Sequence, residues 1–472
     1  MPPNFTTTLK TFARRALWLL VPLAALYAAW FAYAHWRLTT QLARYKAAGE
    51  PVTMHDLVPP PIPDAVNGYR VLVDILATPL TPTEDNFING MTTGIAPSLP
   101  LSPADMTLME SVLTTQAASL AAAERGHSVP KFAAPFNADN PFGSDMLAGM
   151  GRTRGAANIF SVMAMYHAQR GDSVPALRMT DHTRMLAAWT SQRHTLLAHL
   201  VTIAIYQKHA DDLVHLAPEF HLRSATHPLG IQRQQLEPVI KELLDDAPLN
   251  AALVRSLQTE RPYALYVSRR HIPGSFMRPM ANLLAARYND GTDELLAAVK
   301  ADERSYSSSH GTLLSFEAQS NAELLVNGPF SGTNSYGVAY GMHLRALTVR
   351  HLAAAGLAVR LYQLDHGQLP PTLNALVPQY LPAVPVDLSS AARGPIRYDA
   401  TQRIVYSINL NNTDDGGRLP KTYGTNPRDS VPPGNDDMVY PLYRVTSPAS
   451  SAPSAPATLP TTPPPPESAP AE

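Results

Sequence analysis

Apolar residues follow three different patterns along this chain of 472 residues. Residues 16–36 form one continuous apolar stretch, in which His35 is the only side chain that can carry charge near neutral pH. Through most of the chain that follows, apolar residues recur every three or four positions, the spacing of an amphipathic helix. They alternate with polar residues only near the C-terminus, at 403–408, as in a strand. The pattern predicts a mostly α-helical protein with one small β element.

The continuous apolar stretch has the length of a membrane span. As a helix with a rise of about 1.5 Å per residue it would be about 31 Å long, close to the thickness of a bilayer's hydrocarbon core. It holds Trp18, Trp30 and Trp36, and tryptophan is enriched at membrane interfaces. The sequence therefore predicts a transmembrane helix at residues 16–36, with the membrane as a partner of a single-pass protein.

Charge does not decide the orientation of this span, because equal numbers of basic residues flank it. Those residues are Lys10, Arg14, Arg15, Arg37, Arg44 and Lys46. Long domains translocate largely regardless of charge, so we expect residues 1–15 in the cytoplasm and the bulk of the chain outside. The alternative is a cleaved signal peptide, since Ala32-Tyr33-Ala34 has the form of an A-x-A cleavage site.

A proline-rich spacer is predicted after the span, within residues 37–63. Its VPPPIP run at 58–63 must be extended, because proline fixes φ and keeps the preceding residue out of the helical region. The surrounding GEPVT…LVPPPIPDAVN stretch resembles segments that follow the anchors of uncharacterised single-pass bacterial membrane proteins. That resemblance implies a bacterial inner-membrane protein with its bulk in the periplasm, and it implies no particular activity.

Helical spacing marks residues 64–328 as an irregular helical domain. Ser102 before Pro103 predicts a helix start, and that helix should run to about residue 125. A small-residue pattern at 168–177 resembles the turn of a tetratricopeptide helical hairpin; its members are Ala168, Gly171, Asp172, Ala176 and Leu177. Further helices are expected at 146–217, 232–246, 250–270, 292–304 and 312–325.

Residues 338–445 are predicted to form a small α+β module. A long helix at 338–366 should precede a short helix at 372–377 and a β-hairpin built from 396–398 and 403–408. Residues 446–472 are rich in Pro, Ser, Ala and Thr, so they should be disordered. The YxxDxGxxP motif at 362–370, the YLP…PxD run, the hairpin and the acidic loop together resemble the C-terminal part of the type II secretion major pseudopilin, over about 340–443.

The resemblance to the pseudopilin implies a calcium site in the acidic loop, because that loop binds calcium in the family. The implied ligands are Asn411, Asp414, Asp415, Asp436 and Asp437. Calcium takes six to eight oxygen ligands in flexible geometry, which carboxylates and loop carbonyls can supply. The alternative is that Asn-Asn-Thr-Asp-Asp-Gly-Gly is a surface turn, where such residues are common. No prepilin-peptidase motif precedes an apolar helix, so the chain is not expected to assemble as a pilin.

Composition excludes several classes of function. The formal net charge is −1 and the basic residues are not clustered, which argues against a nucleic-acid partner. The absence of cysteine excludes disulfides, thiol catalysis and cysteine-ligated zinc. The chain contains no G-x-S-x-G, P-loop, dinucleotide-binding or H-E-x-x-H motif. No catalytic residue is predicted.

Several His and Asp residues lie close together in the sequence, but their spacing does not predict a catalytic or metal site. Asp181 and His182 are adjacent in sequence, and adjacent side chains do not face each other on a helix. His194 and His199 are five residues apart, which is the wrong spacing for a shared metal. The Asp211-Asp212 and Asp245-Asp246 pairs are expected at solvated helix ends.

These observations favour a membrane-anchored envelope protein whose helical domain is an interaction or scaffold module for a protein partner, with a calcium-stabilised C-terminal module. Such a domain should show an exposed apolar groove or patch. One alternative is a cell-envelope hydrolase, which requires a pocket with a base and an orienting partner assembled from distant residues. The other is an accessory component of a secretion system, which rests on the pseudopilin resemblance.

Overall fold

The computed structural model describes residues 5–92, 100–141, 144–193, 195–272, 274–302, 333–409, 411–418 and 437–443. Side chains are described for the same residues except 5–17, 19, 144–148, 271 and 333–336. Within these ranges the protein is mostly helical and has one small antiparallel sheet, as the sequence predicts. The helix expected at 312–325 and the disordered tail expected at 446–472 lie outside the described residues.

Within the described residues, the helices before the long C-terminal one are α1 (Phe5–Ala47), α2 (Gly68–Ile75), α3 (Pro82–Thr92), α4 (Pro103–Thr115), α5 (Ala117–Gly126), α6 (Ser144–Gln169), α7 (Ser173–Thr190), α8 (Leu196–Leu216), α9 (Arg233–Leu243), α10 (Ala247–His271) and α11 (Arg278–Lys300). Short 3-10 helices are η1 (Met54–Leu57), η2 (Asp64–Val66), η3 (Ala217–Glu219) and η5 (Leu373–Leu376). The long helix α14 (Thr333–His366) precedes the strands β1 (Arg397–Asp399), β2 (Ile404–Ser407) and β3 (Met438–Pro441).

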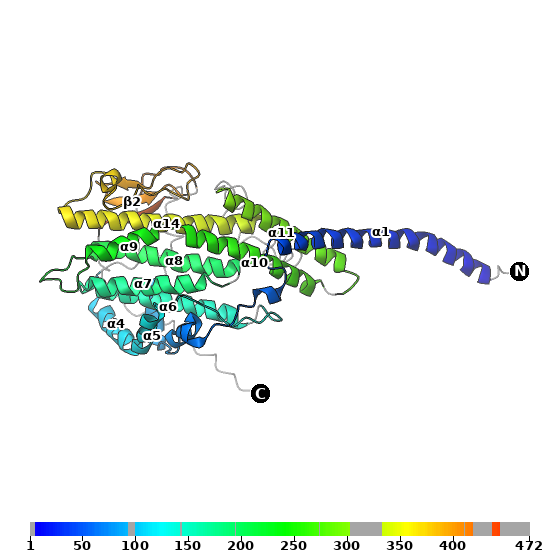
Figure 1. Ribbon diagram of the computed structural model, residues 1–472, viewed down its shortest axis with the longest axis horizontal. Helices are drawn as coiled ribbons and strands as arrows, with labels where there is room; N and C mark the ends of the chain where they lie inside the picture. Colours follow the sequence, from blue (N-terminus) through cyan, green and yellow to red (C-terminus); the bar gives the residue numbers. More distant parts are fainter. Residues whose placement is uncertain are drawn as a thin grey trace, which may run out of the picture.

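Helix α1 is 43 residues long, and its N-terminal part projects away from the rest of the molecule (Figure 1). Its C-terminal part lies along α11. No helix within the described residues is long and apolar enough to cross a membrane. At the start of the predicted span, the side chains of Ala16, Leu17 and Leu19 lie outside the described ones. The helix ends two residues before Gly49, whose φ of +73° is the left-handed conformation that glycine adopts most easily.

The helices stack in layers under the sheet (Figure 1). Helix α14 lies between the sheet and α8, and on its far side α8 contacts α7 and α6. The predicted apolar stripe of α14 is buried, and so is much of the rest of its surface, including Arg350 at 2 % exposure. One hydrophobic core therefore extends from Leu72 to Leu442, across the boundary between the predicted helical domain and the predicted C-terminal module.

Local sequence signals explain several helix ends. Ser102 accepts a hydrogen bond from the backbone N–H of Asp105 at 3.1 Å, and the Asp105 carboxylate accepts one from the N–H of Ser102, a capping box that starts α4 as predicted. That helix ends at Thr115, so the single helix predicted to residue 125 is two helices, α4 and α5. Gly171 makes the turn between α6 and α7 with a φ of +78°.

The sheet has the order β1-β2-β3 and is antiparallel throughout. The β1–β2 hairpin is the predicted one, with Tyr398 opposite Val405, while Tyr440 of β3 lies opposite Val405 on the other side. Ile404 and Val405 of β2 and Ile408 just after it are buried. Strand β3 begins directly after Asp437, one of the predicted calcium ligands, so the pairing of β3 in the sheet determines where that residue lies.

Candidate functional site

The fold brings together three of the predicted calcium ligands beside β3. The Asp437 carboxylate accepts hydrogen bonds from the backbone N–H groups of Asp415, at 3.1 Å, and Gly417, at 2.9 Å. Asn411 donates its side-chain amide to the Asp415 carboxylate at 3.3 Å. Asp436 lies outside the described residues. Asn411, Asp415 and Asp437 therefore lie close together. We call residues 411–417 together with Asp437 the acidic loop.

Asp414 belongs to the same loop and has a different partner. Its carboxylate forms an ion pair with Arg397 of β1 at 2.6 Å. By contrast, Oδ1 of Asp437 is buried and has no hydrogen-bond partner among the described residues. Burial is the main cause that raises the pKa of Asp437, and the charges of Asp415 and Asp414 add to it. A cation or a proton at Asp437 would reduce both the cost of burying its charge and the repulsion from Asp414 and Asp415.

The described part of the acidic loop supplies only part of a calcium site. Within the residues that the structure describes, no three carboxylate or imidazole groups are placed to hold a metal ion. Asp437 offers an unpaired buried oxygen and Asp415 lies next to it, while the side chain of Asp414 is held by Arg397. The chemistry of these donors fits calcium, which prefers oxygen ligands of this kind.

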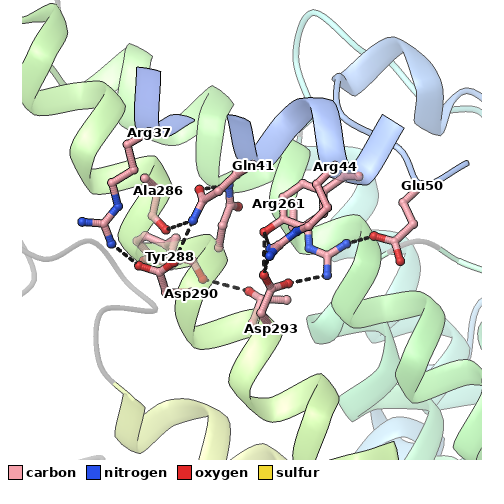
Figure 2. Close-up of polar contacts among 12 residues, drawn as sticks. Arg37, Gln41, Arg44, Glu50, Arg261, Ala286, Tyr288, Asp290 and Asp293 are labelled. Carbon is pink, nitrogen blue, oxygen red and sulfur yellow. Dashed lines mark hydrogen bonds and ion pairs between the residues drawn. The ribbon is translucent and has the colours of Figure 1, made fainter. Parts of the chain in front are cut away.

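A second polar cluster fastens α1 to α11 (Figure 2). Arg37 forms an ion pair with Asp290, and Gln41 donates to the same carboxylate at 2.7 Å and to the carbonyl of Ala286 at 3.2 Å. Asn289 donates to the Gln41 side-chain oxygen at 3.2 Å. These contacts use polar groups on consecutive turns of α1, so they fix both the position and the rotation of the helix.

Arg261 of α10 is the centre of this cluster and is only 2 % exposed. It forms ion pairs with Glu50, just after α1, and with Asp293 at 2.6 Å. Its guanidinium lies 3.8 Å from the ring centroid of Tyr45, whose hydroxyl donates to Asp293 at 2.9 Å. Burial raises the pKa of Tyr45 to about 12, so the hydroxyl keeps its proton at neutral pH. We call the whole cluster the α1 clamp: Arg37, Gln41, Arg44, Tyr45, Glu50, Arg261, Asn289, Asp290 and Asp293.

A groove lies between the proline-rich spacer and the connection that joins α5 to α6. One part has a volume of about 310 Å³ and is lined by residues 58–62 and 133–136 among others. The adjoining part is lined by Phe132, Met150, Tyr263 and Arg193 among others, and shares Pro59 with the first. The Arg193 guanidinium lies 5.3 Å from the ring centroid of Phe132, and burial lowers the pKa of Arg193. The spacer thus forms one wall of a groove that also carries a cation.

Two histidines and two carboxylates form a polar network between the end of α5 and α7. The sequence analysis did not predict it. His127 Nε2 lies 2.8 Å from His182 Nδ1; the other nitrogens lie 3.3 Å from Asp181 and Glu124, respectively. Burial, followed by the charge of His127, lowers the pKa of His182 to about 4. As expected, Asp181 and His182 do not face each other, but both join one network through His127.

The remaining histidine expectation concerns His194 and His199. His194 lies outside the described residues, and His199 is buried and pairs with His343 at 3.1 Å. His343 in turn lies 2.8 Å from the side-chain oxygen of Asn250. Because His343 is 144 residues away from His199, no local spacing could reveal this pair.

The expectation of solvated helix ends is wrong for Asp211 and Asp212. Both lie within α8, where Asp212 is 4 % exposed and accepts a hydrogen bond from Ser161 at 2.6 Å. Asp211 accepts a hydrogen bond from the hydroxyl of Tyr440 in β3. Burial raises the pKa of Asp211 to about 6. These carboxylates are buried because α8 is covered on both sides, by α6 and by α14 with the sheet.

The second pair does lie at helix ends, between α9 and α10, and Asp245 is exposed as expected, whereas Asp246 is half-buried. Asp246 is adjacent to the start of α10 and lies 3.2 Å from His351 and 3.6 Å from Arg350. Both partners belong to α14, so this carboxylate joins the two helices and is not a free end.

Comparison of the chain with family models, with curated proteins and with solved structures finds no match. The pseudopilin resemblance of residues 340–443 therefore stays a prediction from the sequence.

Proposed function

We propose that this chain is a membrane-anchored scaffold that holds a helical domain rigidly at the bilayer surface. The observation that carries the proposal is the contrast between the two parts of α1. Among the large apolar residues in its projecting part, Trp18, Leu20, Val21, Leu23 and Leu26 are 59–72 % exposed. A row of exposed apolar residues on one helix is stable in a bilayer and costly in water.

The domain-side part of α1 supports a rigid attachment. Every charged side chain of the α1 clamp has a partner of opposite charge, and its central Arg261 is buried. Buried ion pairs favour one arrangement, because a change of geometry leaves a charge without its partner. The clamp would therefore transmit the orientation of the anchor to α10 and α11.

The groove beside the spacer supports the interaction role. It combines proline and aromatic walls with the guanidinium of Arg193. Grooves of this composition are typical of sites for extended protein segments, in which apolar side chains give affinity and a charge gives orientation. The partner we propose is an extended protein segment with apolar side chains and one carboxylate.

The acidic loop is proposed as a calcium-stabilised element of the same protein. Asn411, Asp415 and Asp437 would hold the ion, and the unpaired buried oxygen of Asp437 supports this assignment. Bound calcium would supply the positive charge that this cluster of carboxylates lacks, and it would fix the acidic segment against β3.

Anchoring is tested by fractionating bacteria that express the full chain. We expect the wild-type protein in the membrane pellet after a carbonate wash, and a Leu20→Asp, Leu23→Asp variant largely in the soluble fraction. Each buried Asp costs about 3 kcal/mol in a membrane helix, so two would outweigh much of the gain from the apolar residues. The matched control is Leu229→Asp, an exposed leucine (43 %) in the α8–α9 connection, which should stay in the pellet. Release of the wild-type chain by the wash would overturn the proposal.

A further inference from the structure

The connection between α10 and α11 lies directly against the apolar part of α1. The ring of Phe276 stacks on that of Tyr27 with centroids 4.9 Å apart and an angle of 2° between the planes. The Tyr27 hydroxyl donates to the backbone carbonyl of Phe276 at 2.9 Å. The α10–α11 hairpin ends on the side of the molecule from which α1 projects (Figure 1). We call residues 269–272 and 274–280 the hairpin tip.

The hairpin tip combines exposed apolar and basic side chains. Phe276 is 68 % exposed although it stacks on Tyr27, and Met280 is 44 % exposed. Arg269, Arg270 and Arg278 are exposed as well. Burial and the neighbouring charge of Arg278 both lower the pKa of Arg269, so these arginines lie close enough to repel each other. An exposed aromatic ring next to mutually repelling cations is the composition of a surface that meets an anionic lipid interface.

The position of Tyr27 along α1 determines how deep the hairpin tip must lie. Tyr27 is eleven residues after Ala16 and nine before Trp36, which corresponds to about 16 Å and about 14 Å along the helix. If residues 16–36 all lie in the hydrocarbon, the tip beside Tyr27 lies in the bilayer too. If the bilayer begins only at the tip, Phe276 lies at its interface. Both placements bring Phe276 into contact with lipid.

The arginines favour the second placement, in which the hairpin tip lies at the interface and not deep in the hydrocarbon. A guanidinium at the centre of a bilayer costs several kcal/mol, whereas near the surface it is attracted to anionic headgroups. Arg278 and Arg287 are exposed along α11, which accompanies α1 from Tyr27 to Arg37. The domain side of the bilayer therefore lies between Tyr27 and Trp36, where the arginines of the hairpin tip reach the headgroups, and the end of the apolar stretch runs beside protein.

We propose that the hairpin tip is a second membrane contact, which inserts Phe276 into the interface of a bilayer containing anionic phospholipid and places Arg269, Arg270 and Arg278 at the headgroup phosphates. This inference rests on the proposed anchoring by α1. Two contacts at fixed separation would set the tilt of the helical domain, because the α1 clamp prevents rotation about the anchor.

The absence of cysteine from the chain allows a direct test with single labels. Phe276→Cys, Leu23→Cys and Leu229→Cys would each carry an environment-sensitive fluorophore in the full-length protein, reconstituted into vesicles of phosphatidylcholine and phosphatidylglycerol. Lipids brominated near the headgroup or deep in the acyl chain then quench the label according to its depth. We expect strong shallow quenching at 276, deep quenching at 23, and none at 229. Met280→Cys provides a second position on the tip if loss of the Phe276 ring disturbs its stacking.

The outcomes separate the two proposals. Quenching at 23 without quenching at 276 or 280 would leave the anchor intact and overturn the hairpin contact. Absence of quenching at 23 would instead reject the anchor itself. A triple variant, Arg269→Gln, Arg270→Gln, Arg278→Gln, tests the headgroup contact: we expect quenching at 276 to fall severalfold in the mixed vesicles and to become equal to that in pure phosphatidylcholine. Quenching unaffected by these substitutions would show that the arginines do not contact the lipid.

Discussion

The α1 clamp and the acidic loop are both clusters of charged side chains, and they differ in how their charges are balanced. In the clamp, the buried guanidinium of Arg261 lies between the carboxylates of Glu50 and Asp293. In the acidic loop, Asp414 is paired with Arg397, whereas Oδ1 of Asp437 is buried without a hydrogen-bond partner among the described residues. The charges of the clamp are balanced by the protein's own groups, although Nε of Arg261 and Oδ1 of Asn289 are buried without a hydrogen-bond partner among the described residues; we expect the acidic loop, in contrast, to respond to ions and protons in solution.

This difference determines what each cluster contributes. Removing one partner of a buried ion pair leaves an uncompensated charge, which is expensive, so we expect the clamp to hold one geometry. An ionised buried carboxylate without an opposite charge is already expensive, so we expect the acidic loop to gain from whatever neutralises Asp437. The first cluster can serve as a fixed joint and the second as a site for a solute.

The largest expected effect is the loss of the clamp. Arg261→Ala should lower the free energy of unfolding by about 3–5 kcal/mol, because Glu50 and Asp293 lose the buried partner that lies between them. Denaturant unfolding of the full-length protein in detergent measures this cost, and amide hydrogen exchange over residues 38–50 reports whether α1 separates from α11.

Arg44→Ala is the matched control for the clamp, because Arg44 pairs with the same Asp293 carboxylate from a position where its side chain is 62 % exposed. An exposed pair contributes about 0–1 kcal/mol, so this variant should unfold almost like the wild type. Equal losses of unfolding free energy for the two variants would show that the buried Arg261 contributes no more to stability than the exposed Arg44.

A smaller effect is expected where α8 meets β3. Burial raises the pKa of Asp211 from 3.8 to about 6, so the folded state binds the proton more tightly than the unfolded state. Stability contributed by this group is therefore highest at acidic pH and falls as pH rises from about 4 to about 6. Asp211→Asn keeps an oxygen that can accept from the Tyr440 hydroxyl and removes the charge.

Asp211→Asn should consequently be more stable than the wild type at pH 8, by at most about 3 kcal/mol, and the two proteins should converge near pH 4. Melting curves at pH 4, 6 and 8 measure the difference. Asp74→Asn, which changes an exposed carboxylate paired with Arg125, serves as control and should show a difference that varies little with pH. A constant difference for Asp211→Asn as well would show that its charge is not penalised in the fold.

The amphipathic patterns were sufficient to predict the mostly helical class, the α14 stripe and the β1–β2 hairpin, because these depend on residues close in sequence. Helix α11 shows where this reasoning fails. Asn289-Asp290-Gly291 is typical of a turn, and the helix was expected only from residue 292, yet α11 begins at Arg278. Asn289 donates to Gln41 and Asp290 pairs with Arg37, so the polar groups that favour a turn are satisfied by α1.

The candidate sites show the same limit. The calcium ligands were proposed from the resemblance to the pseudopilin, but the pairing of Asp414 with Arg397 depends on how the fold places β1 beside the acidic loop. The α1 clamp joins side chains that are more than two hundred residues apart in the chain. Its local signal is the row Arg37, Gln41, Arg44, which places polar groups on one face of α1 just after the apolar stretch.

The smallest expected effect is the response of the acidic loop to calcium. Calcium at ten times its dissociation constant should add about 1.4 kcal/mol to the free energy of unfolding of the full-length protein, and magnesium should add less because it prefers a rigid octahedral set. Asp437→Asn should abolish the calcium effect, since it removes the charge next to the buried oxygen. Asp414→Asn is the matched control and should keep most of it, because Asp414 is held by Arg397.

The direction of the pH dependence distinguishes calcium binding from a simple surface turn. The pKa of Asp437 is raised in the folded state, so without calcium its contribution to stability falls as pH rises through its titration range. Calcium competes with the proton for the same carboxylate, so its stabilising effect should be larger at pH 7.5 than at pH 5. Melting temperatures with calcium and with chelator at both pH values measure this. An effect of calcium that is equal at both values, or equal in Asp437→Asn, would place the ion elsewhere and leave the acidic loop as a turn.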